Sequence, residues 1–407
     1  MTNGNKSYKW VYKEQLRTDL ESIKTMFSWE IARQALAFHQ QIPNYKMTSL
    51  INLADLAKEL KVGGIWVKNE AERLNLNSFK GLGGTFALYR FIQEKLNIPA
   101  EKMSYDYLVS PEVKKALGFI TFASATDGNH GRGLAWAAQQ LGHNAVIYVH
   151  SDTSEHRIEA IREFGAIVKV IKGNYDDAVN QIIVDSKANG WQIISDTSWQ
   201  DYYAIPTYIM QGYGTIVLET QMQLNAQAIE KPNHIFVQAG VGALAASIFG
   251  FYHTLFDQNS PKCITVEPTN AACLLSSIES ENEEAIQVGG SLETIMAGLS
   301  CGQPSLVAWE TLKRCVDLFL AVPDYHAARG MRLYASPLGN DQRIISGESG
   351  AVTLGLLYAL LKDERFKELK ERLQIDKNSQ ILLINTEGDT DPDHYRQVIW
   401  EGANPTP

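Results

Sequence analysis

A lysine that follows two small polar residues is the first candidate for chemistry in this sequence. Lys80 stands just ahead of a helix predicted from Gly81 to Leu96, with Ser78 or Asn77 as its expected N-cap. In the first turn, the positive end of the helix dipole favours a neutral amine over an ammonium. The neutral amine is the form that makes a Schiff base with a carbonyl group. An isolated Ser-x-Lys is usually an ordinary surface lysine, so the case for a Schiff base at Lys80 depends on the neighbouring motifs.

A polar loop with three glycines precedes a second predicted helix. Between Thr126 and Gly133 the glycines occur among Thr126, Asp127, Asn129 and His130. Such a loop offers backbone N–H groups and a helix N-terminus to an anion, as a bound carboxylate requires. A flexible strand-to-helix turn is the simpler alternative, but it does not account for so many polar side chains in one place.

A second glycine-rich turn follows the predicted strand His234 to Gln238. Residues Gly240 to Ala245 fit the G-x-G-x-x-A form of a dinucleotide fingerprint, and Glu267 closes the next strand, where a ribose-binding acid could lie. Taken alone, this motif supports a nicotinamide-dependent oxidoreductase. A phosphate monoester at a helix N-terminus selects the same glycines, so the motif leaves both ligands open.

Alternating strand and helix patterns surround these motifs. One series begins near residue 130 and a second near residue 234, with strands separated by helices of about ten to fifteen residues. This spacing indicates right-handed βαβ units in parallel sheets that are covered on both faces. We therefore expect an α/β protein of two lobes, each an open, mostly parallel sheet with helices on both faces. The boundary near Ile205 and Pro206 predicts a small domain at 91–202 inserted in a large domain of residues 1–90 and 203–407.

Composition excludes several classes of protein. Lys and Arg total 37 against 46 Asp and Glu, and the net charge of −9 argues against a nucleic-acid partner. No apolar run approaches the roughly eighteen residues that span a bilayer, and the N-terminus lacks the features of a secretory signal. We therefore expect no membrane partner and a cytoplasmic protein. The four cysteines, at 263, 273, 301 and 315, lack metal-binding or disulfide spacing, so buried thiols and no metal site are expected.

Together the motifs resemble the fold type II pyridoxal-phosphate enzymes, the family of threonine and serine dehydratases, serine racemase and cysteine synthase. Ser-Phe-Lys, a Gly-Asn-His loop and a glycine-rich phosphate loop occur there in this order. The resemblance extends from about residue 40 to 395. It is most specific at NSFKGLGG (77–84), ATDGNHGRG (125–133), VQAGVGA (237–243), IMAGLSCG (295–302) and SGESGAV (346–352). It implies pyridoxal 5'-phosphate as the cofactor.

The resemblance also implies a role for individual residues. Lys80 would form the Schiff base and move one proton, with Phe79 beside it at the cofactor. Asn129 would lie beside the cofactor's phenolic oxygen, Glu348 would lie near the cofactor, and Thr386 would hydrogen-bond an unprotonated ring nitrogen. Backbone N–H groups would hold the phosphate at Gly240, Val241, Gly242, Ala243 and Leu244. The substrate, with its carboxylate, would contact Ser78, Thr126, Gly128 and His130.

Asp127 stands where dehydratases and racemases of the family usually carry a small hydroxyl residue. A carboxylate is a stronger base and attracts a cation, so we expect a substrate with a second amino group, such as 2,3-diaminopropionate. Asp196, at the carboxyl end of a predicted strand, is a second catalytic candidate that would face the substrate. With Lys80 and Asp127 on opposite faces of the substrate, both enantiomers could react. The alternatives are a helix N-cap role for Asp127 and a turn or capping role for Asp196.

The expected function is a pyridoxal-phosphate-dependent ammonia-lyase that yields pyruvate and two ammonia molecules, acting as a homodimer. A serine or threonine dehydratase would share every cofactor residue and differ only in the leaving group. A nicotinamide-dependent oxidoreductase would need no Schiff base at Lys80. A non-catalytic descendant of the fold would not need Lys80 or Asp127.

Overall fold

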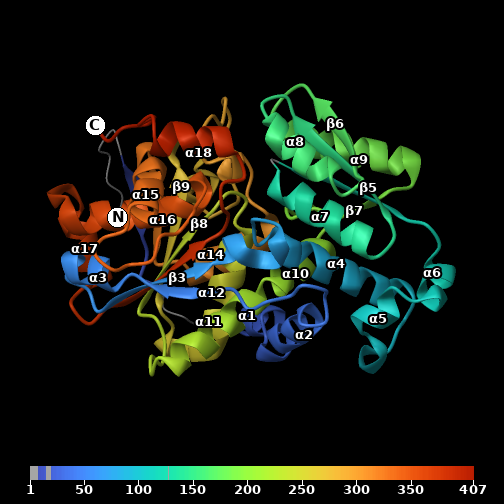
Figure 1. Ribbon diagram of the computed structural model, residues 1–407, viewed down its shortest axis with the longest axis horizontal. Helices are drawn as coiled ribbons and strands as arrows, with labels where there is room; N and C mark the ends of the chain where they lie inside the picture. The colour runs from blue at the N-terminus through green and yellow to red at the C-terminus, as the bar shows by residue number, and fades with distance from the viewer. Residues whose placement is uncertain (1–7, 15–19, 127) are drawn as a thin grey trace.

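The strands of the protein form two separate sheets. The computed structural model describes residues 8–14, 20–126 and 128–407. Figure 1 shows the elements of the smaller sheet in green on the right, the larger sheet on the left, and helix α4, Lys80–Lys95, between them. Both sheets are mostly parallel and carry helices on both faces, which confirms the α/β class. In the described part of the chain no helix is long and apolar enough to cross a bilayer.

The larger sheet has seven strands in the order β1-β10-β9-β8-β11-β3-β2. The inner strands run parallel, whereas the edge strands β1 and β2 run antiparallel to their neighbours. In sheet order the bounds are Lys9–Tyr12, Leu318–Val322, Lys262–Pro268, His234–Gln238, Gln380–Asn385, Gly64–Asn69 and Leu50–Asn52. The inner strands are almost entirely buried, as expected of a parallel sheet between two layers of helices.

The smaller sheet has four parallel strands in the order β6-β5-β4-β7. In that order the bounds are Ile167–Ile171, Asn144–His150, Thr121–Thr126 and Gln192–Ile193. All of these strands lie within the predicted insertion at 91–202, and all described strands of the larger sheet lie outside it. The predicted boundary at residue 91 falls inside α4, however, so this helix continues from one segment into the other.

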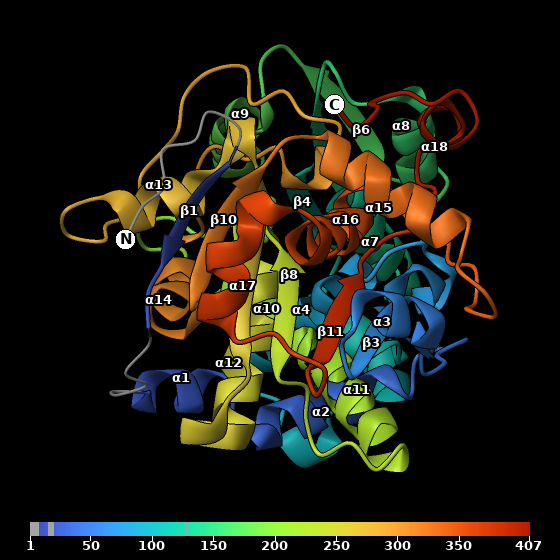
Figure 2. The ribbon, with the colours of Figure 1, turned by 90° about the vertical axis from the view of Figure 1, so that its left-hand side faces the viewer.

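Helices cover both sheets. Those of the segment 91–202 are α5 Tyr105–Leu108, α6 Pro111–Leu117, α7 Asn129–Gln140, α8 Glu155–Arg162 and α9 Tyr175–Asn189. The N-terminal segment contributes α1 Glu21–Met26, α2 Trp29–His39 and α3 Ala54–Leu60. The C-terminal segment contributes α10 Ala204–Gly212, α11 Gly214–Ala226, α12 Ala243–Phe256, α13 Cys273–Glu279, α14 Leu306–Cys315, α15 Tyr325–Ala335, α16 Glu348–Lys362, α17 Lys367–Leu373 and α18 Pro392–Ile399. Figure 2 shows α15, α16 and α17 over one face of the larger sheet.

The expected N-cap of the helix that carries the lysine is wrong. Helix α4 begins at Lys80, with Phe79 in the N-cap position and no side chain capping the helix. Ser78 instead pairs through its backbone with Glu387 in an isolated antiparallel bridge, and Asn77 takes a positive φ of 56°. The backbone ahead of the lysine is therefore tied to the loop that follows β11.

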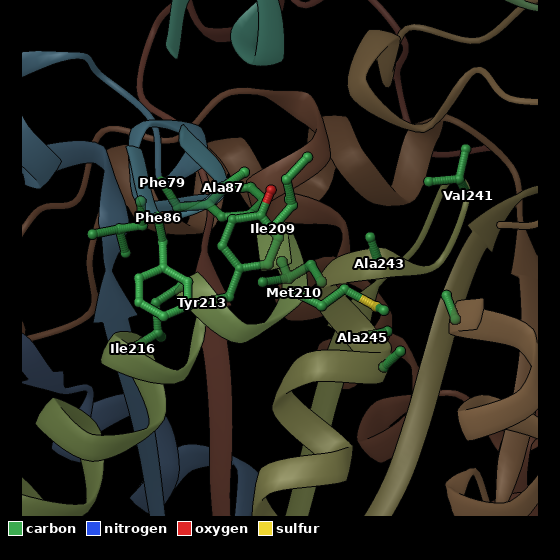
Figure 3. Packing of buried hydrophobic residues seen from close by; sticks show 14 of the residues in the cluster. Phe79, Phe86, Ala87, Ile209, Met210, Tyr213, Ile216, Val241, Ala243 and Ala245 are labelled. Carbon is green, nitrogen blue, oxygen red and sulfur yellow. The ribbon is translucent and has the colours of Figure 1, made fainter. Parts of the chain in front are cut away.

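Close packing fixes the first turn of α4. A Cβ atom on Gly133 of α7 would lie 2.9 Å from both the backbone N of Gly81 and the backbone C of Lys80, so only glycine allows the two helices to approach this closely. On another side the rings of Phe79 and Tyr213 pack with their centroids 4.8 Å apart, in the apolar cluster shown in Figure 3. The backbone of Lys80 is thereby held from two directions.

We predict that Gly133→Ala lowers the free energy of unfolding by about 1–3 kcal/mol, because the added methyl group would press against backbone rather than a movable side chain. Denaturant unfolding measures this loss. Gly289→Ala is the matched control, because its Cβ would meet no atom within 4 Å and its φ is not positive. Equal stability of the two variants would contradict the packing argument.

Candidate active site

A cavity of about 690 Å³ lies between the two sheets, and residues from both line it. Its lining includes several residues singled out from the sequence. The segments around the smaller sheet contribute Thr126, Asn129, His130, Tyr175 and Asp196. The larger lobe and α4 contribute Phe79, Lys80, Gln238, Ala239, Gly240, Val241, Gly242, Ala243, Leu244, Gly298, Leu299, Cys301, Ser349, Thr386 and Glu387.

Lys80 and Asp196 form an ion pair in this cavity. The Nζ of Lys80 donates to Oδ2 of Asp196, and the two side chains are 18% and 6% exposed. Burial alone would raise the pKa of Asp196, but the charges of Lys80 and His130 override it and hold that pKa well below its usual range. The hydroxyl of Tyr175 lies 3.4 Å from Oδ1 of the same carboxylate. Asp196 is therefore a carboxylate anion directed at the candidate Schiff-base lysine.

The loop between β4 and α7 has a defined internal geometry. Oγ1 of Thr126 accepts hydrogen bonds from the N–H groups of Gly128 at 2.9 Å and Gly131 at 3.0 Å. Nε2 of His130 lies 2.9 Å from the carbonyl oxygen of Ile194, so this nitrogen carries the hydrogen. Nδ1 of His130 then faces Asp196 from 3.9 Å. These contacts join the loop to the strand end that carries Asp196.

The glycine-rich turn between β8 and α12 forms the opposite wall. Gly242 has a φ of +95°, a conformation that side-chain-bearing residues rarely adopt. A Cβ on Gly240 would lie 3.2 Å from Sγ of Cys301, so the turn passes very close to the segment 295–302. Helix α12 has no side-chain cap, which leaves the N–H groups of its first turn available to a bound anion.

Two side-chain hydrogen bonds join lining residues of the cavity to one another. Nδ2 of Asn129 donates to Oε2 of Glu387, which joins α7 to the loop after β11. Nε2 of Gln238 donates to Oγ1 of Thr386 at 2.8 Å. Both pairs join residues that are far apart in the sequence, and all four side chains are buried.

Three polar atoms of lining residues are buried without a hydrogen-bond partner among the described residues. They are Nδ1 of His130, Oε1 of Gln238 and Oγ of Ser349. Buried polar groups in proteins are almost always hydrogen-bonded, so such atoms in a cavity indicate a polar ligand. A cavity with a lysine amine, a helix N-terminus for an anion and these polar atoms fits pyridoxal phosphate, which presents an aldehyde, a phosphate and a polar ring.

Three of the described residues selected from the sequence, Ser78, Gly128 and Glu348, are not among the lining. Ser78 and Gly128 are buried, and Asp127 lies outside the described residues. Glu348 lies at the start of α16, where its Oε1 accepts from Nδ1 of His394, and both side chains line a neighbouring cavity of about 550 Å³. The glutamate that lines the main cavity is therefore Glu387, whereas Glu348 lines the neighbouring one.

The acid expected for a nicotinamide-dependent oxidoreductase does not face the cavity. Glu267 is fully buried, and its two oxygens accept from the N–H groups of Leu274 at 2.7 Å and Leu275 at 2.9 Å. Burial raises its pKa to about 8, and these two backbone contacts oppose that shift. Glu267 caps α13 and does not line the cavity beside the glycine-rich turn.

Several lining residues had no recognisable signal in the sequence. Tyr175 opens α9 directly after a capping Asn174 and looks like any first-turn residue of a surface helix. Glu387 stands next to Thr386, but nothing in the local sequence distinguishes it from a loop acid. Ser349 lies in the block SGESGAV, of which only Glu348 was predicted to lie near the cofactor.

Comparisons with known proteins agree with this geometry. Residues 42–386 match the family model described as pyridoxal-phosphate dependent enzyme. A diaminopropionate ammonia-lyase of Salmonella typhimurium is 42% identical over 381 residues, covering 93% of this chain and 94% of that protein. The holo crystal structure of diaminopropionate ammonia-lyase from Escherichia coli superposes with a TM-score of 0.90 at 41% identity, covering 98% of each chain. The same Escherichia coli enzyme in complex with D-serine gives a TM-score of 0.90 at 40% identity, covering 98% of this chain and 99% of that chain.

We predict that Asp196→Asn shifts Lys80 toward the neutral amine, because the variant removes the carboxylate that pairs with the ammonium. Reductive methylation of Lys80 in the cofactor-free protein at neutral pH should become about tenfold faster, the effect of roughly 1.4 kcal/mol. Mass spectrometry of the peptide that contains Lys80 measures the rate. Asp176→Asn is the control, because Asp176 contacts Gln287 at 3.3 Å and does not line the cavity. An unchanged rate in Asp196→Asn would show that the ion pair does not hold the lysine charged.

A pH-dependent contribution to stability is expected from His394. Its hydrogen bond to Glu348 raises its pKa above the ordinary value of 6.5, and partial burial opposes this. The raised pKa means that the stabilisation is fully present below about pH 6.5 and is lost as the pH rises through the pKa of the folded state. His394→Ala should therefore lower the free energy of unfolding more at pH 6 than at pH 9, by about 1 kcal/mol or less because the side chain is partly solvated.

Denaturant unfolding of the wild type and His394→Ala at both pH values measures this difference. His156→Ala is the control, since His156 lies 3.8 Å from Asp393 on the exposed surface. A loss of stability in His394→Ala that is the same at pH 6 and pH 9 would exclude the charged pair with Glu348.

Proposed function

The chain belongs to the pyridoxal-phosphate-dependent enzyme family, and from this premise we propose that it is an ammonia-lyase acting on 2,3-diaminopropionate. The observation that carries the proposal is the likeness to diaminopropionate ammonia-lyases over nearly the whole of both chains. The cavity agrees with it, because it combines a lysine amine, a buried carboxylate and the first turn of a helix. The overall reaction consumes one water and yields pyruvate and two ammonia molecules.

The residues that would hold the cofactor follow from the walls of the cavity. The N–H groups from Gly240 to Leu244 would bind the phosphate at the start of α12. Asn129 would lie beside the phenolic oxygen, and Thr386 beside the ring nitrogen. Bound there, the group supplies a carbonyl for Lys80 and a conjugated ring that accepts electron density from the substrate's α-carbon.

Lys80 and Asp196 would manage the protons. Asp196 keeps the lysine amine in place and, as a buried carboxylate, attracts the ammonium groups of the substrate. The same carboxylate would hold the β-nitrogen as an ammonium, so that this nitrogen already carries the proton it needs and leaves as ammonia rather than as an amide anion. The unsaturated three-carbon product hydrolyses in water to pyruvate and the second ammonia.

Asp127 would be the second base. The loop that carries it begins at Thr126 in the cavity and continues into α7 through Asn129 and His130, which also line the cavity. If Asp127 and Lys80 approach the α-carbon from opposite sides, each removes the proton of one enantiomer. Thr126, Gly128, His130 and Ser78 would position the substrate through its carboxylate.

The smaller domain, residues 91–202, would close over the substrate. Helix α7 of this domain packs closely on α4, and away from these helices the contacts with the larger domain include the hydrogen bonds between Ser198 and Ser305 at 2.8 Å and between Asp176 and Gln287 at 3.3 Å. Closure would exclude water until the reaction is complete. We also propose a homodimer, the commonest symmetric assembly, and a cytoplasmic location, in keeping with four buried free cysteines.

A panel of amino acids, with pyruvate and ammonia measured together, tests the proposed activity. Both enantiomers of 2,3-diaminopropionate should give one pyruvate and two ammonia molecules per turnover. Serine and threonine should react at least about tenfold more slowly, because hydroxide is a poorer leaving group and lacks the attraction of an ammonium to the carboxylates. Turnover of serine or threonine at a higher kcat/KM than diaminopropionate would assign the protein to the dehydratases.

The two-base assignment has its own test. Asp127→Asn should abolish turnover of one enantiomer, by about a hundredfold or more, and leave the other nearly unchanged. Lys80→Ala serves as the reference, since it should abolish turnover of both. An equal loss of both enantiomers in Asp127→Asn would exclude Asp127 as the base for one of them.

A further inference from the structure

Gln238 and Thr386 stand side by side at the ends of two neighbouring strands. Gln238 is the last residue of β8, Thr386 follows the last residue of β11, and these strands pair in parallel. Both residues line the cavity, and they are only 2% and 3% exposed. A hydrogen bond between their side chains is therefore shielded from water, so its direction has chemical consequences.

The orientation of the Gln238 amide is fixed by a backbone carbonyl. Nε2 of Gln238 lies 3.0 Å from the carbonyl oxygen of Ile384 and 2.8 Å from Oγ1 of Thr386. A carbonyl oxygen can only accept, so the atom that faces Ile384 must be the NH₂ group. The flipped amide would place Oε1 against that carbonyl oxygen, two acceptors at hydrogen-bond distance. The amide nitrogen is thus the atom that also faces Thr386.

The hydroxyl of Thr386 must then accept from Gln238. Since Oγ1 takes the second hydrogen of the amide, its own hydrogen points elsewhere. Among the described residues no side-chain or backbone acceptor is hydrogen-bonded to this hydroxyl, and Oγ of the neighbouring Ser349 has no partner either. The remaining direction is the cavity. Thr386 therefore presents a hydrogen-bond donor to whatever ring atom lies opposite.

We propose that Gln238 is a positioning residue of the enzyme, which holds the Thr386 hydroxyl as a donor to the cavity and so keeps the cofactor's ring nitrogen unprotonated. The proposal rests on the proposed function only in that pyridoxal phosphate occupies this cavity. The second lone pair of Oγ1 could accept from a protonated ring nitrogen, but the hydroxyl hydrogen would then lack an acceptor, because the amide nitrogen of Gln238 can only donate. The ring is consequently a weaker electron acceptor, which suits elimination over reactions that need a long-lived carbanion.

The position of Thr386 adds to this arrangement. Its backbone carbonyl accepts from the N–H of Phe79 at 3.2 Å, which links it to the residue next to Lys80. The hydroxyl that would set the protonation of the ring and the lysine that would bond to the cofactor are therefore carried by two segments that a backbone hydrogen bond joins. A displacement of Gln238 would alter the direction of the hydroxyl without moving this backbone contact.

Nitrogen-15 NMR of the holoenzyme, loaded with cofactor labelled at the ring nitrogen, tests the proposal. The wild type should show an unprotonated, hydrogen-bonded nitrogen. Gln238→Met keeps the side-chain length but has no donor, so the Thr386 hydroxyl can turn to the Ile384 carbonyl. The signal should then move toward that of a ring nitrogen without a donor, and kcat for diaminopropionate should fall roughly two- to tenfold with KM little changed.

A double-variant comparison separates an action through Thr386 from a direct one. Thr386→Val alone should move the signal in the same direction, and adding Gln238→Met to it should move the signal no further. If Gln238→Met moves the nitrogen signal by the same amount in the wild type and in Thr386→Val, the proposal is overturned, because Gln238 would then act on the ring by itself. A wild-type signal that reports a protonated nitrogen would also overturn it.

Gln211→Met is the matched control. Gln211 is another buried glutamine whose Nε2 donates to a backbone carbonyl, that of Met26 at 3.0 Å, and whose Oε1 has no partner among the described residues, but it does not line the cavity. Its signal should equal that of the wild type, and an equal displacement in both variants would overturn the proposal. Gln238→Asn, which withdraws the amide by one methylene but keeps its polarity, provides a second variant if Gln238→Met does not fold; an unchanged signal there would likewise overturn it.

The NMR experiment and the amino-acid panel test separate claims, so one claim can fail while the other stands. If diaminopropionate gives no pyruvate while the variants move the signal as expected, the proposed substrate is wrong and the role of Gln238 stands. If diaminopropionate is converted and the signal does not respond to Gln238→Met, the function stands and the role of Gln238 is excluded.

Discussion

The contact between Lys80 and Asp196 is the interaction on which the arrangement of the cavity depends. It joins the first residue of α4 to the segment after β7, and so it links the two sheets at the point where chemistry is expected. Both charges are largely withdrawn from water, and neither would be stable there alone. The protein therefore needs both partners in place, and it obtains them by holding the helix and the strand end independently.

A buried group of charges holds the approach to the lysine. Lys68 on β3, Glu70 and Arg73 in the turn that follows, and Glu219 on α11 form ion pairs of 2.7–2.8 Å with fully buried side chains. Such a group adds little net stability, because the cost of removing the charges from water is large, but it accepts only one geometry. Since the chain runs from Arg73 to the lysine segment, this group anchors the chain shortly before α4 begins.

The polar residues of the cavity share one structural origin. Four strands, β4, β7, β8 and β11, direct their carboxyl ends to it and are followed there by the Thr126 loop, Asp196, the glycine-rich turn and Thr386. In parallel sheets the ends of several strands meet at one edge, which gathers loops from distant parts of the chain. Two sheets that face each other in this way supply a phosphate-binding wall and a substrate-binding wall from separate segments.

Local patterns in the sequence were sufficient for the fold class, for the lysine segment and for both glycine-rich turns, because helix and strand periodicity and turn chemistry act over a few neighbouring residues. The tertiary structure decided which of the remaining acids reach the cavity. Glu348 pairs with His394, Glu267 caps α13, and Glu387 meets Asn129 across 258 positions of sequence. The direction of the Gln238 amide depends on a carbonyl of another strand. Such partners come from separate strands whose order in the sheet differs from their order in the chain, so no stretch of sequence contains both halves of the interaction.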